Sequence, residues 1–184
     1  MDRIFASWLE RQRRDALELS AASDHLTIDP EPGMRPASRF IAQFSAPTMV
    51  RTNDEVRRIE AFTVLIQFPP SFLRSAHDAG QIVNVIEPNQ VWHPNVMGPF
   101  ICLGHIAPGT GLIELIFQVY EILTFQKLTP REDDALNHNA CVWARQHMAE
   151  FPLSAAPLSR RANEWSIHEI APRQTSLERG RDRV

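Results

Sequence analysis

One stretch of the chain, residues 93–103, reads His-Pro-Asn-Val-Met-Gly-Pro-Phe-Ile-Cys-Leu and places a cysteine shortly after a stiff turn. The first proline fixes a backbone dihedral, and the asparagine amide can both donate and accept hydrogen bonds. A sulfur nucleophile needs an accessible thiol and hydrogen-bond donors where an oxyanion develops. Cys102 is therefore the candidate nucleophile, and Asn95 is the candidate side chain that ties down the loop or faces the oxyanion.

This stretch lies within a longer segment, residues 87–111, where prolines and glycines are scattered and the apolar residues follow no period. Long irregular segments are unusual inside a small domain and often carry function. The second cysteine, Cys141, follows Ala140 in an apolar helical pattern, where free cysteine is commonly a small buried hydrophobe. The sequence therefore predicts an exposed Cys102 and a buried Cys141.

The residues before this segment predict one helix followed by strands. Apolar residues recur at helical spacing through 2–20. Alternating or β-branched runs predict three strands, at 39–44, 59–68 and 82–86. The turn-forming residues 29–33 and the polar, proline-bearing residues at 48–53 and 69–78 are expected to form connections. Short links between consecutive strands favour an antiparallel meander.

The residues after the segment predict helices. Residues 112–125 are apolar except for one narrow polar stripe, which predicts a buried helix. A further helix is expected from about 134 to 149. Residues 129–132 resemble a capping box, which would start that helix slightly earlier. Residues 165–170 are expected to add a short terminal element. The predicted fold class is therefore α+β.

Composition and charge fit an ordinary globular chain of 184 residues, with 43% hydrophobic and 22% charged residues. The net charge of −3 gives no reason to expect nucleic-acid binding, and the arginine-rich residues 173–184 are interrupted by acidic ones. No apolar run is long enough to cross a membrane, and no secretory signal opens the chain. With only two cysteines, we expect a reduced, soluble, cytoplasmic protein.

The stretch around Cys102 resembles the ubiquitin-conjugating enzyme family, in which a His-Pro-Asn motif and a short glycine-containing loop precede the active cysteine. The likeness extends to Phe68-Pro-Pro70 and to Leu128-Thr-Pro-Arg-Glu-Asp-Asp-Ala-Leu-Asn137. It implies a helix, a four-stranded antiparallel meander, the cysteine loop and C-terminal helices. It also implies a catalytic domain over residues 1–150 and an extension or tail over 151–184.

The resemblance implies that Cys102 accepts a ubiquitin-like protein from an activating enzyme as a thioester and passes it to an amine of a target protein. No cofactor and no metal are expected. Asn95 would support the loop and stabilise the oxyanion, and His93 would brace the loop rather than act as a base. Asp134 would orient or deprotonate the amine, or would simply be a carboxylate at a helix N-terminus; Asp133 is its nearest competitor.

The chain also departs from the family pattern. Gly104 and His105 stand where family members often carry an aspartate two residues after the cysteine, and Ala135 replaces a common proline. These changes leave the need for a ligase uncertain. They resemble the conjugating enzymes of bacterial operons that also encode an activating enzyme and a ubiquitin-like protein, which implies antiviral defence. His105 could lower the pKa of Cys102 or could be a plain exposed loop residue.

Three alternatives stay open from the sequence. A chain of this fold could be a catalytically silent scaffold that only binds ubiquitin-like proteins. A metal-dependent hydrolase could use His93, Cys102, His105 and Cys141, although their spacing matches no compact zinc signature. A cysteine protease is the weakest alternative, because no spacing of nucleophile and base supports it.

Overall fold

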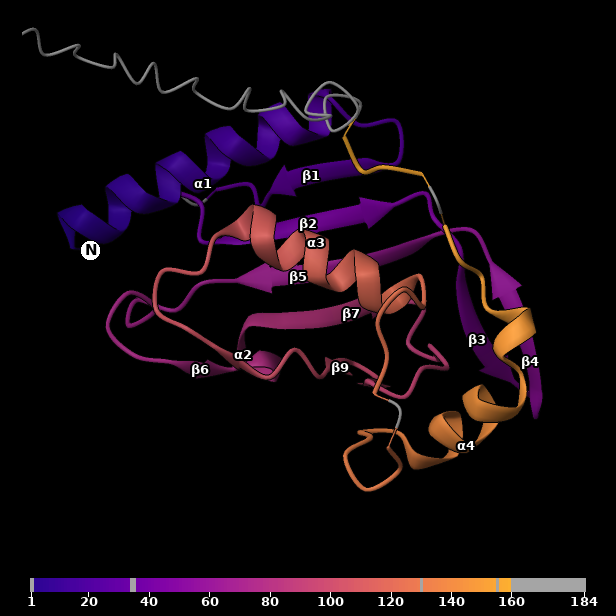
Figure 1. Ribbon diagram of the computed structural model, residues 1–184. Coiled ribbons are helices and arrows are strands. Elements are labelled where there is room, and N and C mark those ends of the chain that lie inside the picture. The colour runs from indigo at the N-terminus through magenta and orange to yellow at the C-terminus, as the bar shows by residue number, and fades with distance from the viewer. Residues whose placement is uncertain (1, 34–35, 130, 155, 160–184) are drawn as a thin grey trace, which may run out of the picture.

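An antiparallel sheet forms the centre of the computed structural model, which describes residues 2–33, 36–129, 131–154 and 156–159 (Figure 1). Its strands lie in the spatial order β1-β2-β5-β7-β9-β8, and every neighbouring pair is antiparallel. The strands are β1 (Leu26–Pro30), β2 (Arg39–Phe44), β5 (Phe62–Gln67), β7 (Val83–Glu87), β8 (Val96–Met97) and β9 (Phe100–Ile101). Alternate residues of β5 are buried, as a strand with one face on a core requires.

Two further pairs of strands stand outside this sheet. They are β3 (Thr48–Thr52) with β4 (Glu55–Ile59), and β6 (His77–Asp78) with β10 (His105–Ile106). The second pair places the chain that follows the cysteine beside the chain that follows β5. It therefore builds one side of the candidate site.

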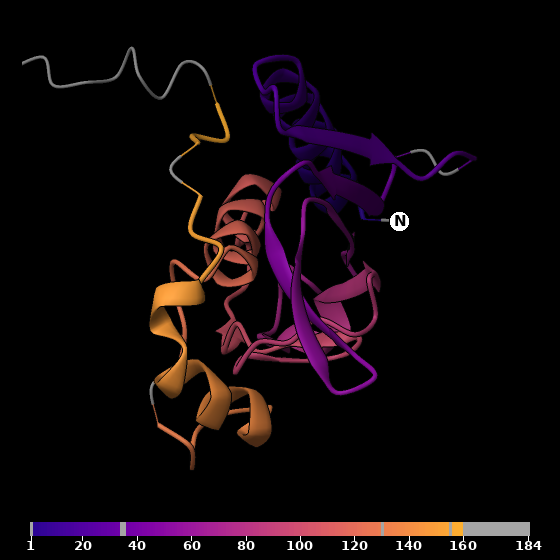
Figure 2. The ribbon, with the colours of Figure 1, turned by 90° about the vertical axis from the view of Figure 1, so that its right-hand side faces the viewer.

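Helices cover one face of the sheet and one end of the molecule (Figures 1 and 2). They are α1 (Arg3–Ala21), the short α2 (Ala79–Ile82), α3 (Leu112–Leu123), α4 (His138–Gln146) and a 3-10 turn, η1 (Met148–Glu150). The side-chain oxygen of Gln12 on α1 accepts a hydrogen bond of 2.7 Å from the N–H of Leu112, so α1 caps the start of α3. None of the helices in the described part of the chain has both the length and the apolar character needed to span a membrane.

The core is a single cluster between the helices and the sheet. At one end, Trp8 packs edge-on against Phe68 with ring centroids 4.8 Å apart, and Phe68 meets Phe72 at the same distance. These contacts hold the Pro69-Pro70 turn against α1. Aromatic pairs of this geometry add to the stabilisation that burial alone supplies.

The residues that follow η1 also contact the core. Phe151 packs on Phe125 with ring centroids 4.8 Å apart, and the hydroxyl of Tyr120 donates to the carbonyl of Ala156 at 2.8 Å. Leu158 is only 2% exposed. The boundary expected near residue 150 stays a prediction. The terminal element expected at 165–170 and the arginine-rich residues 173–184 lie outside the described residues.

The α+β class and most of the expected elements are confirmed, but the connections upstream of the site were partly misjudged. Residues 48–53 are not a connection: 48–52 form β3, which pairs with β4 across a turn in which Asn53 and Asp54 have φ of 51° and 65°. Asparagine and aspartate tolerate this left-handed conformation, which two-residue hairpin turns require. The strand expected at 59–68 starts later, at Phe62, because Ile59 ends β4.

The expected start of the last helix is also wrong. The helix begins at His138 rather than near residue 134 or earlier, and its N-cap is Asn137, whose side chain accepts a hydrogen bond of 3.1 Å from the N–H of Ala140. Thr129, the expected cap, interacts with another loop instead. Residues 132–134 form a turn before the helix.

Candidate active site

Cys102 is exposed and follows directly after β9. Its N–H donates a hydrogen bond of 2.7 Å to the carbonyl oxygen of Asn95. The preceding Ile101 is buried and pairs with Val96 of β8. The sulfur is therefore open to solvent, while the backbone that leads into Cys102 is fixed by Asn95 and Val96.

The side chain of Asn95 is 8% exposed, and Thr129 holds both ends of its amide. Its Nδ2 donates to the Thr129 hydroxyl at 2.7 Å, and its Oδ1 accepts from the Thr129 N–H at 2.8 Å. This arrangement ties the loop that carries Cys102 to the chain that follows α3. It favours the loop-supporting role over the oxyanion role, and both remain predictions.

His93 is fully buried at the base of the same loop. Its Nδ1 accepts a hydrogen bond of 3.0 Å from the N–H of Asn95, and its ring packs edge-on against Phe125 at 4.4 Å. Burial disfavours the charged imidazolium and lowers the pKa of His93 to about 3, against a weaker opposing interaction with the backbone of Lys127. Its Nε2 makes no hydrogen bond of standard geometry within the described residues. His93 has the position of a neutral brace, and this role, which the resemblance implies, stays a prediction.

A shallow groove of about 350 Å³ runs beside Cys102. Phe100 and Leu136, both partly exposed, form apolar walls, and Asp78 and His105 add the polar part of the lining. The floor includes Gly80, where a Cβ atom would lie only 2.9 Å from the ring of Phe100. A side chain at Gly80 would therefore force the ring of Phe100 to shift.

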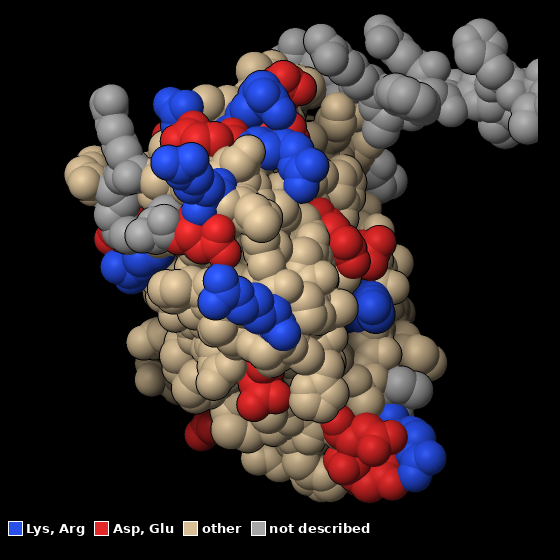
Figure 3. Space-filling model, turned by 90° about the vertical axis from the view of Figure 1, so that its left-hand side faces the viewer, with Lys and Arg blue, Asp and Glu red and all other residues tan. Residues whose placement is uncertain are grey.

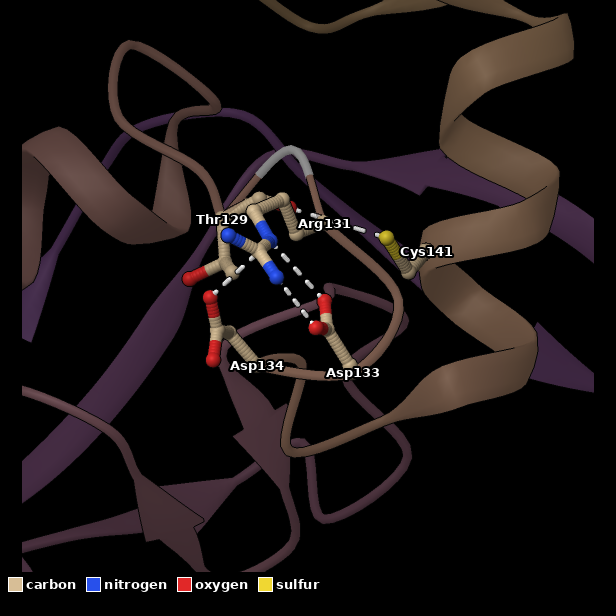
Figure 4. A network of polar contacts seen from close by, with 5 residues as sticks. All are labelled: Thr129, Arg131, Asp133, Asp134 and Cys141. Atoms are coloured by element: carbon tan, nitrogen blue, oxygen red, sulfur yellow. Dashed lines mark hydrogen bonds and ion pairs between the residues drawn. The ribbon is translucent and has the colours of Figure 1, made fainter.

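Asp134 is not part of the groove lining. Its side chain is 62% exposed and lies 3.4 Å from the guanidinium of Arg131, which also pairs with Asp133 (Figure 4). The hydrogen bond from Arg131 lowers the pKa of Asp133. The alternative reading of Asp134 as a carboxylate at a helix N-terminus is wrong, because α4 begins four residues later. The structure thus brings together Cys102, Asn95 and His93, and it leaves Asp134 in a neighbouring turn.

Four residues of the site have no signal in the sequence. Thr129 lies 34 positions after the asparagine that it holds. Asp78, Phe100 and Leu136 come from three separate segments and meet only because β6 pairs with β10 and the turn before α4 folds back. Phe100 stands two residues before Cys102, but the other three are defined by contacts between segments that are distant in the sequence, and periodicity does not report such contacts.

The metal-site alternative finds no ligand set in the described part of the chain, where no three His, Cys, Asp or Glu side chains gather closely enough to hold an ion. Cys141 is buried on α4 with its thiol 3.6 Å from the carbonyl of Thr129 (Figure 4). Burial raises the pKa of Cys141. This second thiol is therefore poorly placed to act as a nucleophile.

Comparison with known proteins gives a likeness of fold. No family profile and no curated protein sequence matches the chain. A ubiquitin-conjugating enzyme domain from Toxoplasma gondii is similar in structure, with a TM-score of 0.50 and 15% sequence identity, over 78% of this chain and 88% of that one. A ubiquitin-conjugating enzyme from Plasmodium falciparum matches at a TM-score of 0.43 and 17% identity, over 62% of this chain and 94% of that one. The Toxoplasma likeness shows the fold, and at this identity it shows the fold alone.

Proposed function

We propose that this chain, which has the fold of ubiquitin-conjugating enzymes, carries a ubiquitin-like protein as a thioester on Cys102 and passes it to an amine of a target protein. The observation that carries the proposal is the exposed Cys102 on a loop whose backbone is fixed by Asn95. An activating enzyme, a ubiquitin-like protein and a target are the partners that this role requires. A ligase remains unassigned, and a cytoplasmic site of action remains part of the proposal.

Transfer of a thioester to Cys102 depends mainly on holding the two reactants in position. In the first step the thiolate of Cys102 attacks the thioester carbonyl on the activating enzyme, a new C–S bond forms, the C–S bond to the donor sulfur breaks, and the donor leaves as a thiolate. One thioester replaces another, so the step needs little driving force, and holding the reactants in place carries much of the barrier reduction. A solvent-open sulfur on a fixed backbone meets that need.

A partner surface for this role lies on α1. Arginine side chains gather with acidic ones over the face that α1 covers (Figure 3). Arg3, Arg11 and Arg14 line a shallow hollow on this helix together with Ile4 and Leu73. We propose that this hollow, next to the Pro69-Pro70 turn, receives a protein partner of the transfer.

A small acyl donor tests the chemistry without a cognate modifier. The full chain is incubated with the 2-mercaptoethanesulfonate thioester of acetyl-Gly-Gly, and intact mass spectrometry follows the adduct. We expect acylation of Cys102 that a reducing thiol reverses, and we expect Cys102→Ala to lose it while Cys141→Ser retains it. Free lysine should then discharge the adduct at least about 10-fold faster than it discharges the same acyl group on N-acetylcysteine amide, because the site orients the reaction.

The comparison with N-acetylcysteine amide separates a carrier from a scaffold. Discharge no faster than from this free cysteine would favour a silent protein of the same fold and reject the proposed transfer. The bacterial-operon assignment and the role in antiviral defence need a different observation. Genes for an activating enzyme and a ubiquitin-like protein beside the gene for this chain would support them, and their absence there would oppose them.

A further inference from the structure

The pairing of β6 with β10 brings a histidine and a carboxylate to the edge of the Cys102 groove. His105 pairs with Asp78 in the register of the two strands, and their side chains approach to 3.4 Å between Nδ1 and Oδ1. Both side chains are well exposed, and both line the groove together with Cys102. The positive φ of Gly104, 76°, lets the chain turn between the cysteine and this strand.

Transfer to an amine requires a proton acceptor. A lysine side chain carries a proton at neutral pH and can attack a carbonyl only after losing it. The residues expected from the sequence do not supply this acceptor. His93 is buried and faces Asn95, the amide of Asn95 is held by Thr129, and Asp134 pairs with Arg131 outside the groove.

We propose that His105 accepts the proton of the amine that attacks the Cys102 thioester, and that Asp78 positions the imidazole. The inference rests on the proposed carrier function. The lysine ammonium first loses one proton to water. As the C–N bond then forms, one of the two remaining N–H protons moves to Nε2 of His105, the C–S bond breaks, and Cys102 leaves as a thiolate. The proton then returns to the thiolate or to water. Asp78 contacts Nδ1, so it stabilises the tautomer whose Nε2 is free to accept, which makes Asp78 a positioning residue.

The groove also indicates the class of amine. Its walls, Phe100 and Leu136, are apolar and partly exposed, and its polar end is formed by Asp78 and His105. A lysine side chain has an apolar stem of four carbons and a polar tip. We infer that the stem lies between the two walls and that the tip reaches the thioester beside His105.

The expected pH dependence follows from the groups that face His105. Within the described residues, the ionisable side chains lining the groove are Asp78 from β6, Cys102 from the loop and His105 itself. His77, the neighbour on β6, points elsewhere: its ring stacks on Phe72 and contacts Ser75. An imidazole can accept a proton only in its neutral form, so the contribution of His105 should be smaller in acid than in base.

The test separates loading from discharge. The full chain and its His105→Ala, His105→Gln and Asp78→Asn variants are loaded with acetyl-Gly-Gly from the same thioester donor and then discharged with free lysine. We expect loading to stay unchanged in all of them. Discharge should fall by about 100-fold in both His105 variants, at the lower end of the range of general base catalysis, and by less in Asp78→Asn. The ratio of wild-type to His105→Ala discharge should rise with pH.

The matched control is His138→Ala, which removes another exposed histidine that pairs with a carboxylate, Glu132, but does not line the groove. Discharge from this variant should equal that of the wild type. Normal discharge from His105→Ala would overturn the inference while leaving the carrier function in place. Equal losses of loading and discharge would also overturn it, because they would mean that His105 acts on the Cys102 thiol. Wild-type discharge no faster than from free cysteine would instead reject the carrier function itself.

Discussion

His93 lies between the cysteine loop and Phe125 without access to solvent, so its ionisation is coupled to folding. Its pKa is about 3 in the folded chain, against an ordinary value of 6.5. Between these values the unfolded chain binds one more proton than the folded chain. Above pH 6.5, ionisation of His93 therefore costs the folded chain no stability. Between pH 6.5 and pH 3, ionisation of His93 in the unfolded chain lowers the free energy of unfolding by about 1.4 kcal/mol for each pH unit.

We expect this loss to disappear in His93→Gln, which cannot take up the proton. Urea denaturation of both proteins at steps between pH 7 and pH 5 measures this loss. The quantity to compare is the slope of the free energy of unfolding against pH, not the absolute free energy of either protein. The partly exposed His147 gives a matched control, because His147→Gln should keep the wild-type slope. A wild-type slope that His93→Gln shares would contradict the buried neutral state.

At the scale of single residues, the sequence predicts what a local motif contains and misses what a distant segment adds. Cys102 and Asn95 stand close together in the chain, so their chemistry is visible in the sequence. The partner of Asn95 is Thr129, and the pair His105–Asp78 spans two strands that are far apart in the chain. Such pairs form only after the chain has folded.

The loop of the cysteine and the segment after α3 are joined by the Asn95–Thr129 contact. Thr129→Val keeps the shape and the backbone N–H but removes the hydroxyl that accepts from Asn95. The amide nitrogen, nearly buried, would then lack its partner. We expect the free energy of unfolding to fall by about 1 to 2 kcal/mol, as for other unpaired buried polar groups.

Thr129→Ser keeps the hydroxyl and is the control for this change. Chemical denaturation should place it near the wild type, and both variants should be compared in the loading of Cys102 by acetyl-Gly-Gly thioester. Loss of loading in the valine variant alone would link the contact to the presentation of the thiol. Equal stabilities of the two variants would mean that the hydroxyl contributes nothing.

Elements with a strong period were predictable, and elements that depend on turns were not. The strand at 39–44 and the buried helix α3 appear where hydrophobic spacing places them. The strand at 48–52 was missed because its polar neighbours suggested a connection, whereas the left-handed Asn53 and Asp54 make a hairpin. The expected start of α4 is wrong because Thr129, the expected cap, is bonded to Asn95, whereas Asn137 caps the helix.

On the scale of the whole molecule, the chain returns to its core after α4. The four-stranded meander that the resemblance implies is present as β1-β2-β5-β7, with β9 and β8 added at the edge that leads to Cys102. The residue pattern predicts only three of these strands: β1 was missed, and its last two residues fall in the turn expected at 29–33. The chain beyond η1 then crosses back towards α3, where Tyr120 donates to the carbonyl of Ala156. The folded body of the described chain therefore includes contacts made by residues after 150.

Leu158 and Leu153 allow a test of how much the residues after 150 contribute to the free energy of unfolding, because they are the same residue type in different surroundings. Leu158 is 2% exposed within the core cluster, whereas Leu153 is 62% exposed. Leu158→Ala should lower the free energy of unfolding by about 2 to 5 kcal/mol, the cost of a cavity in a packed core. Leu153→Ala should stay within about 0.5 kcal/mol of the wild type, as surface changes do. Urea denaturation of the full chain measures both, and equal values for the two variants would mean that the segment after residue 150 adds nothing to the folded body that presents Cys102.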